Sequence, residues 1–195
     1  MPAWSLIVIG YLVGSIPTAY LAGRFLKKGD IRTLGDANSG AANAFRELGK
    51  TAGIIVYLVD VAKGAAVILI AQASHAEQSV VLFAGAAAVI GHSFPVWLGF
   101  RGGRGVAVLI GTLYVLVTVP GLIITVPVLL IVYLVRATTP ALAFLFIVLI
   151  LLDWWRDIPG WVIIYQTAMA AFTGIVTWYR SRDRIAVKVD RRPAD

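Results

Sequence analysis

The residues best suited to chemistry lie in two polar, glycine-rich segments of an otherwise strongly apolar chain. The first segment, residues 24–52, alternates glycines with short amide and hydroxyl side chains and includes Gly35, Asn38, Gly40 and Asn43. Glycine lets a backbone turn tightly and approach a ligand, and a helix start directs free N–H groups at an anion. Because a plain turn between helices needs only a few residues, we interpret this segment as a phosphate-binding loop. An extended inter-helix turn is the simpler alternative.

The second segment, residues 91–106, places two arginines around a glycine pair. Its core reads Arg101-Gly102-Gly103-Arg104. Flexible backbone amides and two guanidinium groups would together form a good receptor for phosphate. The alternative is that the arginines mark the cytoplasmic end of a membrane helix and that the glycines allow close helix packing.

Polar residues also interrupt the apolar stretches. Asp60 and Lys63 are three positions apart and therefore share one helical face. Ionisable groups in hydrocarbon are costly unless paired, which favours a structural ion pair. His92 either donates a hydrogen bond to a bound oxyanion or packs as a structural histidine beside Pro95. Pro17 predicts a kink with a freed carbonyl in the first apolar stretch.

Composition indicates a membrane protein. The 195 residues are 59% apolar and 14% charged, with a mean hydropathy of +0.86, whereas soluble domains carry about 25% charged residues. The absence of cysteine excludes disulfides, thiol nucleophiles and cysteine-ligated metals. His75 and His92 are too far apart in sequence for a helical metal site. We interpret the net charge of +7 as topology and attraction to anionic headgroups, and not as nucleic-acid binding.

Seven apolar stretches are candidates for membrane spans, each of which needs about 20 residues to cross about 30 Å of hydrocarbon. They are Ala3–Gly23, Gly53–Ala73, Ser79–Gly99, Val106–Val119, Gly121–Val135, Thr138–Leu152 and Gly160–Trp178. The fourth, fifth and sixth are short, so five or six spans is the alternative. We therefore predict an all-α integral membrane protein, with residues 1–180 as one transmembrane domain and residues 181–195 as a basic cytoplasmic tail.

The distribution of basic residues predicts the orientation. With seven spans and the N-terminus outside, fifteen of the seventeen basic residues face the cytoplasm, and the short outer loops carry Glu77, Asp153 and Asp157. The positive-inside rule selects this arrangement. The inner residues are Arg24, Lys27, Lys28, Arg32, Arg46, Lys50, Arg101, Arg104, Arg136, Arg180, Arg182, Arg184, Lys188, Arg191 and Arg192.

Several motifs, in matching order and spacing from about Gly10 to Ile185, resemble one family. They are Gly14-Ser15-Ile16-Pro17-Thr18-Ala19-Tyr20, Asp30-Ile31-Arg32, the Gly/Asn loop, Lys63-Gly64, Gly91-His92-Ser93-Phe94-Pro95-Val96 and Gly102-Gly103-Arg104-Gly105-Val106-Ala107. The chain is similar to the bacterial membrane acyl-phosphate:glycerol-3-phosphate acyltransferases, the PlsY family. The resemblance implies seven spans in the bacterial plasma membrane, an active site on the cytoplasmic side and no cofactor. The implied reaction moves a fatty acyl group from acyl phosphate to the 1-hydroxyl of glycerol 3-phosphate, which gives lysophosphatidic acid.

The resemblance also assigns roles to residues. Asn38 and Arg104 are the implied catalytic residues. The implied substrate-binding residues are Gly35, Gly40, Asn43, Arg46, His92, Arg101, Gly102, Gly103 and Arg184. An acyl phosphate has an excellent leaving group, so the catalyst needs positioning and donors for phosphate and a developing oxyanion, and no covalent nucleophile.

The chain departs from the family pattern at several positions. Asp36 replaces a serine, Arg101 and Arg104 replace lysines, and Arg184 replaces an asparagine; Thr139, Leu142 and Ser181 also differ. We hypothesise that Asp36 pairs with Arg184, which would cancel repulsion between the carboxylate and a phosphate. These departures keep open a catalytically altered relative that binds an anionic lipid or phosphate. A small transporter is a weaker alternative, because the sequence has no internal repeat.

Overall fold

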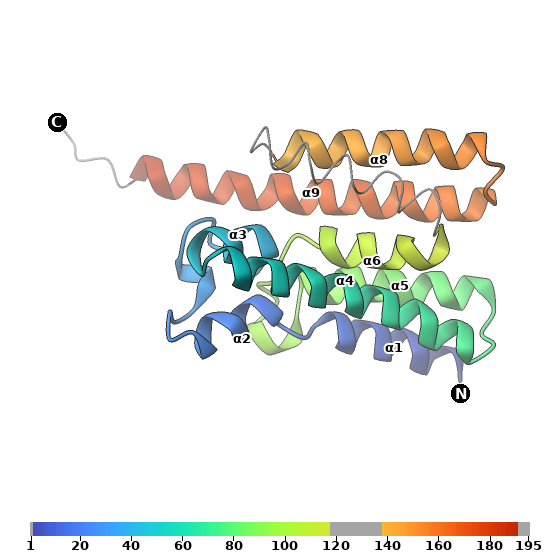
Figure 1. Ribbon diagram of the computed structural model, residues 1–195, viewed down its shortest axis with the longest axis horizontal. Helices are drawn as coiled ribbons and strands as arrows, with labels where there is room; N and C mark the ends of the chain where they lie inside the picture. The colour runs from blue at the N-terminus through green and yellow to red at the C-terminus, as the bar shows by residue number, and fades with distance from the viewer. Residues whose placement is uncertain (1, 118–137, 191–195) are drawn as a thin grey trace.

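The computed structural model describes residues 2–117 and 138–190, with the side chains of residues 138–142 and 182–190 excepted. Within these ranges all regular structure is helical (Figure 1). The elements are α1 (Ala3–Gly14), α2 (Thr18–Phe25), η1 (Ile31–Thr33), α3 (Ala41–Glu47), α4 (Lys50–Ala73), α5 (Gln78–Ser93), η2 (Val96–Leu98), α6 (Val106–Leu116), α8 (Thr138–Trp155) and α9 (Gly160–Asp190). The prediction of an all-α protein is confirmed for the described part.

Four helical segments are long and apolar enough to cross a membrane: Ala3–Phe25, Lys50–Ala73, Gln78–Leu98 and Gly160–Ser181. The apolar helices Val106–Leu116 and Ala143–Trp155 are shorter. These segments correspond to six of the seven predicted spans, and the predicted span Gly121–Val135 lies outside the described residues. The helix α9 continues to Asp190, so the predicted boundary at residue 180 falls inside a helix.

The outward faces of the helices are apolar, as a lipid environment requires. Leu58, Phe83 and Ile164 are 57%, 62% and 71% exposed, and many other large apolar side chains are exposed with them. Water would penalise so large an apolar surface, whereas lipid tails would not. The surface therefore fits a protein that is solvated by a bilayer.

The first span is broken at Pro17, as predicted. The helix α1 ends at Gly14 and α2 begins at Thr18, because proline has no N–H to continue the helical hydrogen bonds. The carbonyl oxygen of Ile16 is left outside both helices, and it accepts a hydrogen bond from Nζ of Lys63 at 2.9 Å. The kink thus provides an acceptor for a buried cation.

Small residues bring the helices into close contact. A Cβ atom on Gly14 of α1 would lie 2.1 Å from the carbonyl oxygen of Ala88 in α5, and one on Gly111 of α6 would lie 2.0 Å from that of Val61 in α4. Such close backbone approach is typical of helix pairs in membranes. The core around these contacts includes Ile68, which is fully buried.

The helices run roughly alongside one another, and the connections fall at two ends of the bundle (Figure 1). The residues between α2 and α4 and those between α5 and α6 lie at one end, on the left of Figure 1. The N-terminus and the α4–α5 and α8–α9 turns lie at the other end, while α9 finishes at the left. The two polar segments singled out in the sequence therefore share one end of the bundle.

Candidate functional site

The first polar segment is folded around the side chain of Asn43, which is 1% exposed. Its amide nitrogen donates to the carbonyl oxygens of Ile31 at 3.1 Å, Leu34 at 3.0 Å and Asn38 at 2.9 Å. Its Oδ1 accepts a hydrogen bond from the N–H of Asp36 at 2.8 Å. Asn43 thus connects four parts of the loop, and the loop shape depends on its amide.

The loop residues Gly35, Asn38 and Gly40 lie around this amide. Gly35 has φ +51, and a Cβ there would lie 2.3 Å from Oε1 of Glu47, so the position requires glycine. Asn38 is 6% exposed, and its Oδ1 accepts from the N–H of Gly40 at 2.9 Å, directly before α3. The predicted loop residues therefore form one compact turn, and their contact with a substrate stays a prediction.

The side chain of Asp36 joins the two polar segments. Its Oδ2 forms an ion pair with Nη2 of Arg46 in α3 and lies 3.7 Å from Nη2 of Arg104 in the second segment. Asp36 and the two guanidinium groups are all partly exposed, with side chains 29%, 45% and 20% accessible. Two cations that were predicted to bind phosphate are thus close enough to share one anionic oxygen. The side chain of Arg184, the predicted partner of Asp36, lies outside the described part, so that pairing stays a prediction.

The glycine pair of the second segment is held on both sides of its backbone. The N–H groups of Gly102 and Gly103 donate to the carbonyl oxygens of Ser93 and His92, both at 3.1 Å. The guanidinium group of Arg180 in α9 donates to the carbonyl oxygens of Gly102, Gly103 and Ser93. The two amides predicted to bind phosphate are therefore occupied within the fold, and the turn is fixed directly before Arg104.

A second connection between the polar segments runs through Arg32. Asp30 caps η1 and binds the guanidinium group of Arg32, with Nη2 and Oδ2 2.7 Å apart, while Nη1 of Arg32 donates to the carbonyl oxygen of Leu98 at 2.8 Å. The hydrogen bond from Arg32 holds the pKa of the Asp30 carboxyl below its usual range. The guanidinium group also lies 5.5 Å from the ring centroid of Tyr20. Arg32 thus fixes the distance between the first segment and η2.

A buried polar cluster lies behind the glycine pair. Asp60, Lys63 and His92 are 1%, 6% and 7% exposed. Nζ of Lys63 lies 2.9 Å from Oδ1 of Asp60 and 3.0 Å from Nδ1 of His92, and Thr18 donates to Oδ1 of Asp60 at 2.9 Å. The predicted ion pair on one face of the helix is confirmed. Through His92, this ion pair contacts the segment that carries Arg104.

The remaining predicted positions lie outside the contacts described above. Arg101 is exposed at the start of the glycine pair. Ser181 is partly exposed, and its hydroxyl donates to the carbonyl oxygen of Trp178. The side chains of Thr139 and Leu142, like that of Arg184, lie outside the described part of the chain.

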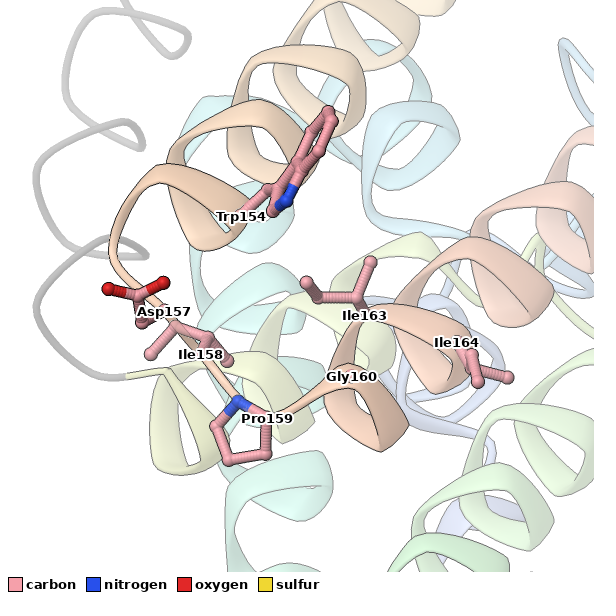
Figure 2. Close-up of a pocket in the computed structure, with 7 residues that line it drawn as sticks. All are labelled: Trp154, Asp157, Ile158, Pro159, Gly160, Ile163 and Ile164. Carbon is pink, nitrogen blue, oxygen red and sulfur yellow. The ribbon is translucent and has the colours of Figure 1, made fainter.

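A pocket at the other end of the bundle is unrelated to these residues (Figure 2). It lies at the turn between α8 and α9 and is lined by Trp154, Asp157, Ile158, Pro159, Gly160, Ile163 and Ile164. Its lining is mainly apolar and has one carboxylate but no cation. Because a phosphate would find no cationic donor there, we place the candidate site at the end that carries the two polar segments.

Sequence reasoning missed two residues that shape the site. Arg180 was predicted only as a basic residue at the inner end of the last span, and Arg32 as a cytoplasmic charge within the motif Asp30-Ile31-Arg32, with no role at the site. Both donate to backbone carbonyl groups of the second segment. For Arg180, its position just after the predicted span Gly160–Trp178 marked the end of that span but not the direction of its side chain.

Comparisons with known proteins agree on one family. The sequence pattern of the family described as glycerol-3-phosphate acyltransferase matches residues 4–189. "Glycerol-3-phosphate acyltransferase 4" of Dehalococcoides mccartyi is 41% identical over 176 residues, which cover 90% of this chain and 95% of the relative. "Glycerol-3-phosphate acyltransferase" of Cereibacter sphaeroides is 47% identical over 122 residues, 61% of this chain and 60% of the relative.

Solved structures give the same result. Two crystal structures of PlsY, described as an integral membrane glycerol 3-phosphate acyltransferase, superpose with TM-scores of 0.81 and 0.80. They are 30% and 31% identical to this chain, and each match covers 97% of this chain and 93% of the other. The first is the lysophosphatidic acid form and the second is the glycerol 3-phosphate form.

Proposed function

The chain belongs to the glycerol-3-phosphate acyltransferase family, and we propose that it uses acyl phosphate as its acyl donor at the end of the bundle where the two polar segments meet. It is an integral membrane acyltransferase that converts glycerol 3-phosphate to lysophosphatidic acid. The donor, the site residues and the orientation in the membrane are the proposed parts. The family membership argues against the non-catalytic relative and the transporter considered from the sequence.

The observation that carries the proposed site is the approach of Arg46 and Arg104 to one carboxylate oxygen. Two guanidinium groups that reach the same anionic oxygen from separate segments can also reach two oxygens of one phosphate group. The site has partly exposed arginines at the rim and a rigid loop around Asn43 beneath them. We therefore assign phosphate binding to Arg46 and Arg104, with Arg101 as a third cation at the rim.

The proposed reaction needs little beyond positioning and charge. The 1-hydroxyl oxygen of glycerol 3-phosphate attacks the carbonyl carbon of the acyl phosphate, the bond from that carbon to the phosphate oxygen breaks, and inorganic phosphate leaves. The hydroxyl proton passes to the departing phosphate or to water. Charge develops on the carbonyl oxygen and on the phosphate, and fixed cationic donors stabilise both without reorganisation. Arg104 and Asn38 are the donors that we propose for this step.

The proposed topology brings both substrates to this site. We propose seven spans in the bacterial plasma membrane, with the N-terminus outside and the two polar segments in the cytoplasm. The end of α6 and the start of α8 lie at opposite ends of the bundle (Figure 1), which fits the proposed count of seven spans. Glycerol 3-phosphate would then arrive from the cytoplasm, and the acyl chain of the donor would enter between helices from the bilayer.

A direct assay with competing donors tests the proposal. Purified protein in detergent micelles receives labelled glycerol 3-phosphate together with one donor: acyl phosphate, acyl-coenzyme A or the acyl thioester of acyl carrier protein. We expect labelled lysophosphatidic acid to form with acyl phosphate and not with either of the other two donors. Product formed only with a thioester donor would contradict the donor assignment while leaving the acyltransferase activity intact.

A further inference from the structure

The contact between Asp36 and the two arginines bears on how tightly this enzyme holds phosphate. We name the guanidinium groups of Arg46 and Arg104 the two-arginine site. Resting on the function proposed above, we propose that the Asp36 carboxylate is an internal competitor for substrate phosphate: it occupies the two-arginine site and leaves it when a phosphate group binds.

Oδ2 of Asp36 contacts Nη2 of Arg46 and lies 3.7 Å from Nη2 of Arg104, so one carboxylate oxygen lies between both cations. A phosphate oxygen that bridged the same two groups would have to take nearly the same position. Two anionic oxygens cannot share it, because they repel each other at such short range in a partly dry site.

Phosphate binding requires only the side chain of Asp36 to move. The N–H of Asp36 is fixed by Oδ1 of Asn43 at 2.8 Å, so the backbone of the loop is held independently of the carboxylate. Rotation of the side chain alone would release the arginines, and the loop would keep its shape. No hydrogen bond of the Asn43 amide needs to break.

The carboxylate of Asp36 differs from the buried carboxylate of Asp60 in its access to water. Asp60 is 1% exposed and its ion pair with Lys63 is enclosed, so separating the two would leave an unpaired charge in an apolar environment. The Asp36 side chain is 29% exposed and that of Arg46 is 45% exposed. Water can solvate the carboxylate as it leaves, so Asp36 is an exchangeable partner and Asp60 is a permanent one.

The charge balance gives the direction of the effect. Among these three side chains, two guanidinium groups and one carboxylate sum to one net positive charge, and removal of the carboxylate raises that sum to two. A phosphate then binds without displacing a competing anion. We therefore expect Asp36→Asn, which keeps the size of the side chain, to bind phosphate about tenfold more tightly, a typical effect of one charge-assisted contact at a partly exposed site.

The test measures binding and turnover separately in the full-length protein. Calorimetry gives the Kd of inorganic phosphate and of glycerol 3-phosphate for the wild type, Asp36→Asn and Asp36→Glu at one fixed ionic strength. Glu77→Gln is the control for net charge, because Glu77 is exposed at the α4–α5 turn at the other end of the bundle. We expect a lower Kd only for Asp36→Asn, and a Kd near that of the wild type for Asp36→Glu and Glu77→Gln.

Steady-state kinetics then identify which substrate phosphate competes with Asp36. A lower KM for glycerol 3-phosphate, with that for acyl phosphate unchanged, would assign the two-arginine site to the acceptor; the reverse would assign it to the donor. Both results support the proposal that the Asp36 carboxylate competes with substrate phosphate. An unchanged or weaker phosphate affinity in Asp36→Asn overturns it, and so does a collapse of kcat at constant KM, which would make Asp36 a proton acceptor in the reaction.

Failure of this inference is distinguishable from failure of the proposed function. If the wild type makes no lysophosphatidic acid from acyl phosphate, the donor assignment is wrong, but the calorimetric comparison still decides whether Asp36 competes with phosphate. If Asp36→Asn unfolds, Asp36→Ser provides the same loss of charge with a smaller side chain, and the same shift in Kd is expected.

Discussion

Nζ of Lys63 lies 3.0 Å from Nδ1 of His92, and this contact defines which ring nitrogen of His92 carries the proton. An ammonium group has only donors, so Nδ1 must accept and the hydrogen must be on Nε2. Nε2 faces the glycine pair, because a Cβ atom on Gly103 would lie 2.1 Å from it. We infer that Lys63 fixes a neutral His92 whose N–H donor is directed toward the second polar segment.

Removal of Lys63 should therefore destabilise the protein more than its size suggests. Lys63→Met leaves Asp60 as an unpaired carboxylate that is 1% exposed, and breaking a buried pair in this way typically costs about 3–5 kcal/mol. The double variant Asp60→Asn/Lys63→Met should lose less stability than Lys63→Met alone. Thermal unfolding in one detergent measures both. A double variant that is no more stable than Lys63→Met would show that the two charges do not interact.

The close approach of His92 to Gly103 predicts a second effect. In Gly103→Ala the new Cβ would collide with the buried imidazole ring, so the ring or the turn before Arg104 must move. We expect a loss of about 1–3 kcal/mol in stability together with reduced acyl transfer. Gly160→Ala is the matched control, because a Cβ there meets no atom within 4 Å. Equal stability and equal acyl transfer in the two variants would contradict the close packing of Gly103 against His92.

The carboxyl group of Asp30 predicts a dependence on pH. The hydrogen bond from Arg32 lowers its pKa below the usual 3.8, so the folded state binds a proton less readily than the unfolded state. The contribution of the Asp30–Arg32 pair to folding stability is therefore complete above the usual pKa. It is lost as the pH falls through the lowered pKa of the folded protein. We expect wild type to be more stable than Asp30→Asn at neutral pH, with the difference in Tm shrinking below about pH 4. A difference that stays constant into acid would mean that the ionised carboxylate contributes nothing.

The chain length and apolar pattern predicted much of the fold, because span ends follow directly from where hydrocarbon can no longer solvate the sequence. Pro17 predicted the kink, and the spacing of Asp60 and Lys63 predicted their ion pair. The ion-pair partner of Asp36 could not be predicted from the sequence in this way. Arg46 is ten positions away in α3, beyond an irregular turn, and no periodicity brings the two together.

Hydrogen bonds from arginine side chains to backbone carbonyl groups also could not be predicted from the sequence. Arg180 and Arg32 each look like one of many cytoplasmic cations, and only the folded turn at Gly102 and Leu98 gives them acceptors. The glycine pair was predicted to bind phosphate through its backbone amides, and this prediction could not account for backbone acceptors either. A glycine shows that a backbone can approach a ligand, but it does not show whether neighbouring carbonyl groups have already taken its N–H.

The proposed orientation can be tested with single cysteines, since the natural chain contains none. Ala3→Cys and Ala194→Cys place one thiol at each end of the chain. A membrane-impermeant maleimide added to intact spheroplasts should label Ala3→Cys and leave Ala194→Cys unlabelled until the membrane is opened. Labelling of Ala194→Cys from outside would reverse the orientation and place the two polar segments away from the cytoplasm.

Arg180 holds the second polar segment from α9. Its guanidinium group donates to three carbonyl groups, those of Ser93, Gly102 and Gly103, and its Cζ lies 5.6 Å from the ring centroid of Phe94. Lysine would keep the positive charge, but a compact ammonium group cannot reproduce the planar arrangement of donors. If Arg180 acts by fixing the turn before Arg104, charge alone will not replace it.

We therefore expect Arg180→Lys to lower kcat/KM for acyl transfer about tenfold, nearly as much as Arg180→Gln, since both lose the same hydrogen bonds to the turn. Arg156→Lys, an exposed arginine at the α8–α9 turn, should retain wild-type kinetics. Full recovery in Arg180→Lys would instead show that the position supplies only positive charge. Under the positioning role the loss should also depend on Arg104: in an Arg104→Ala background, Arg180→Lys should cost little more, because the residue that the turn positions is already absent.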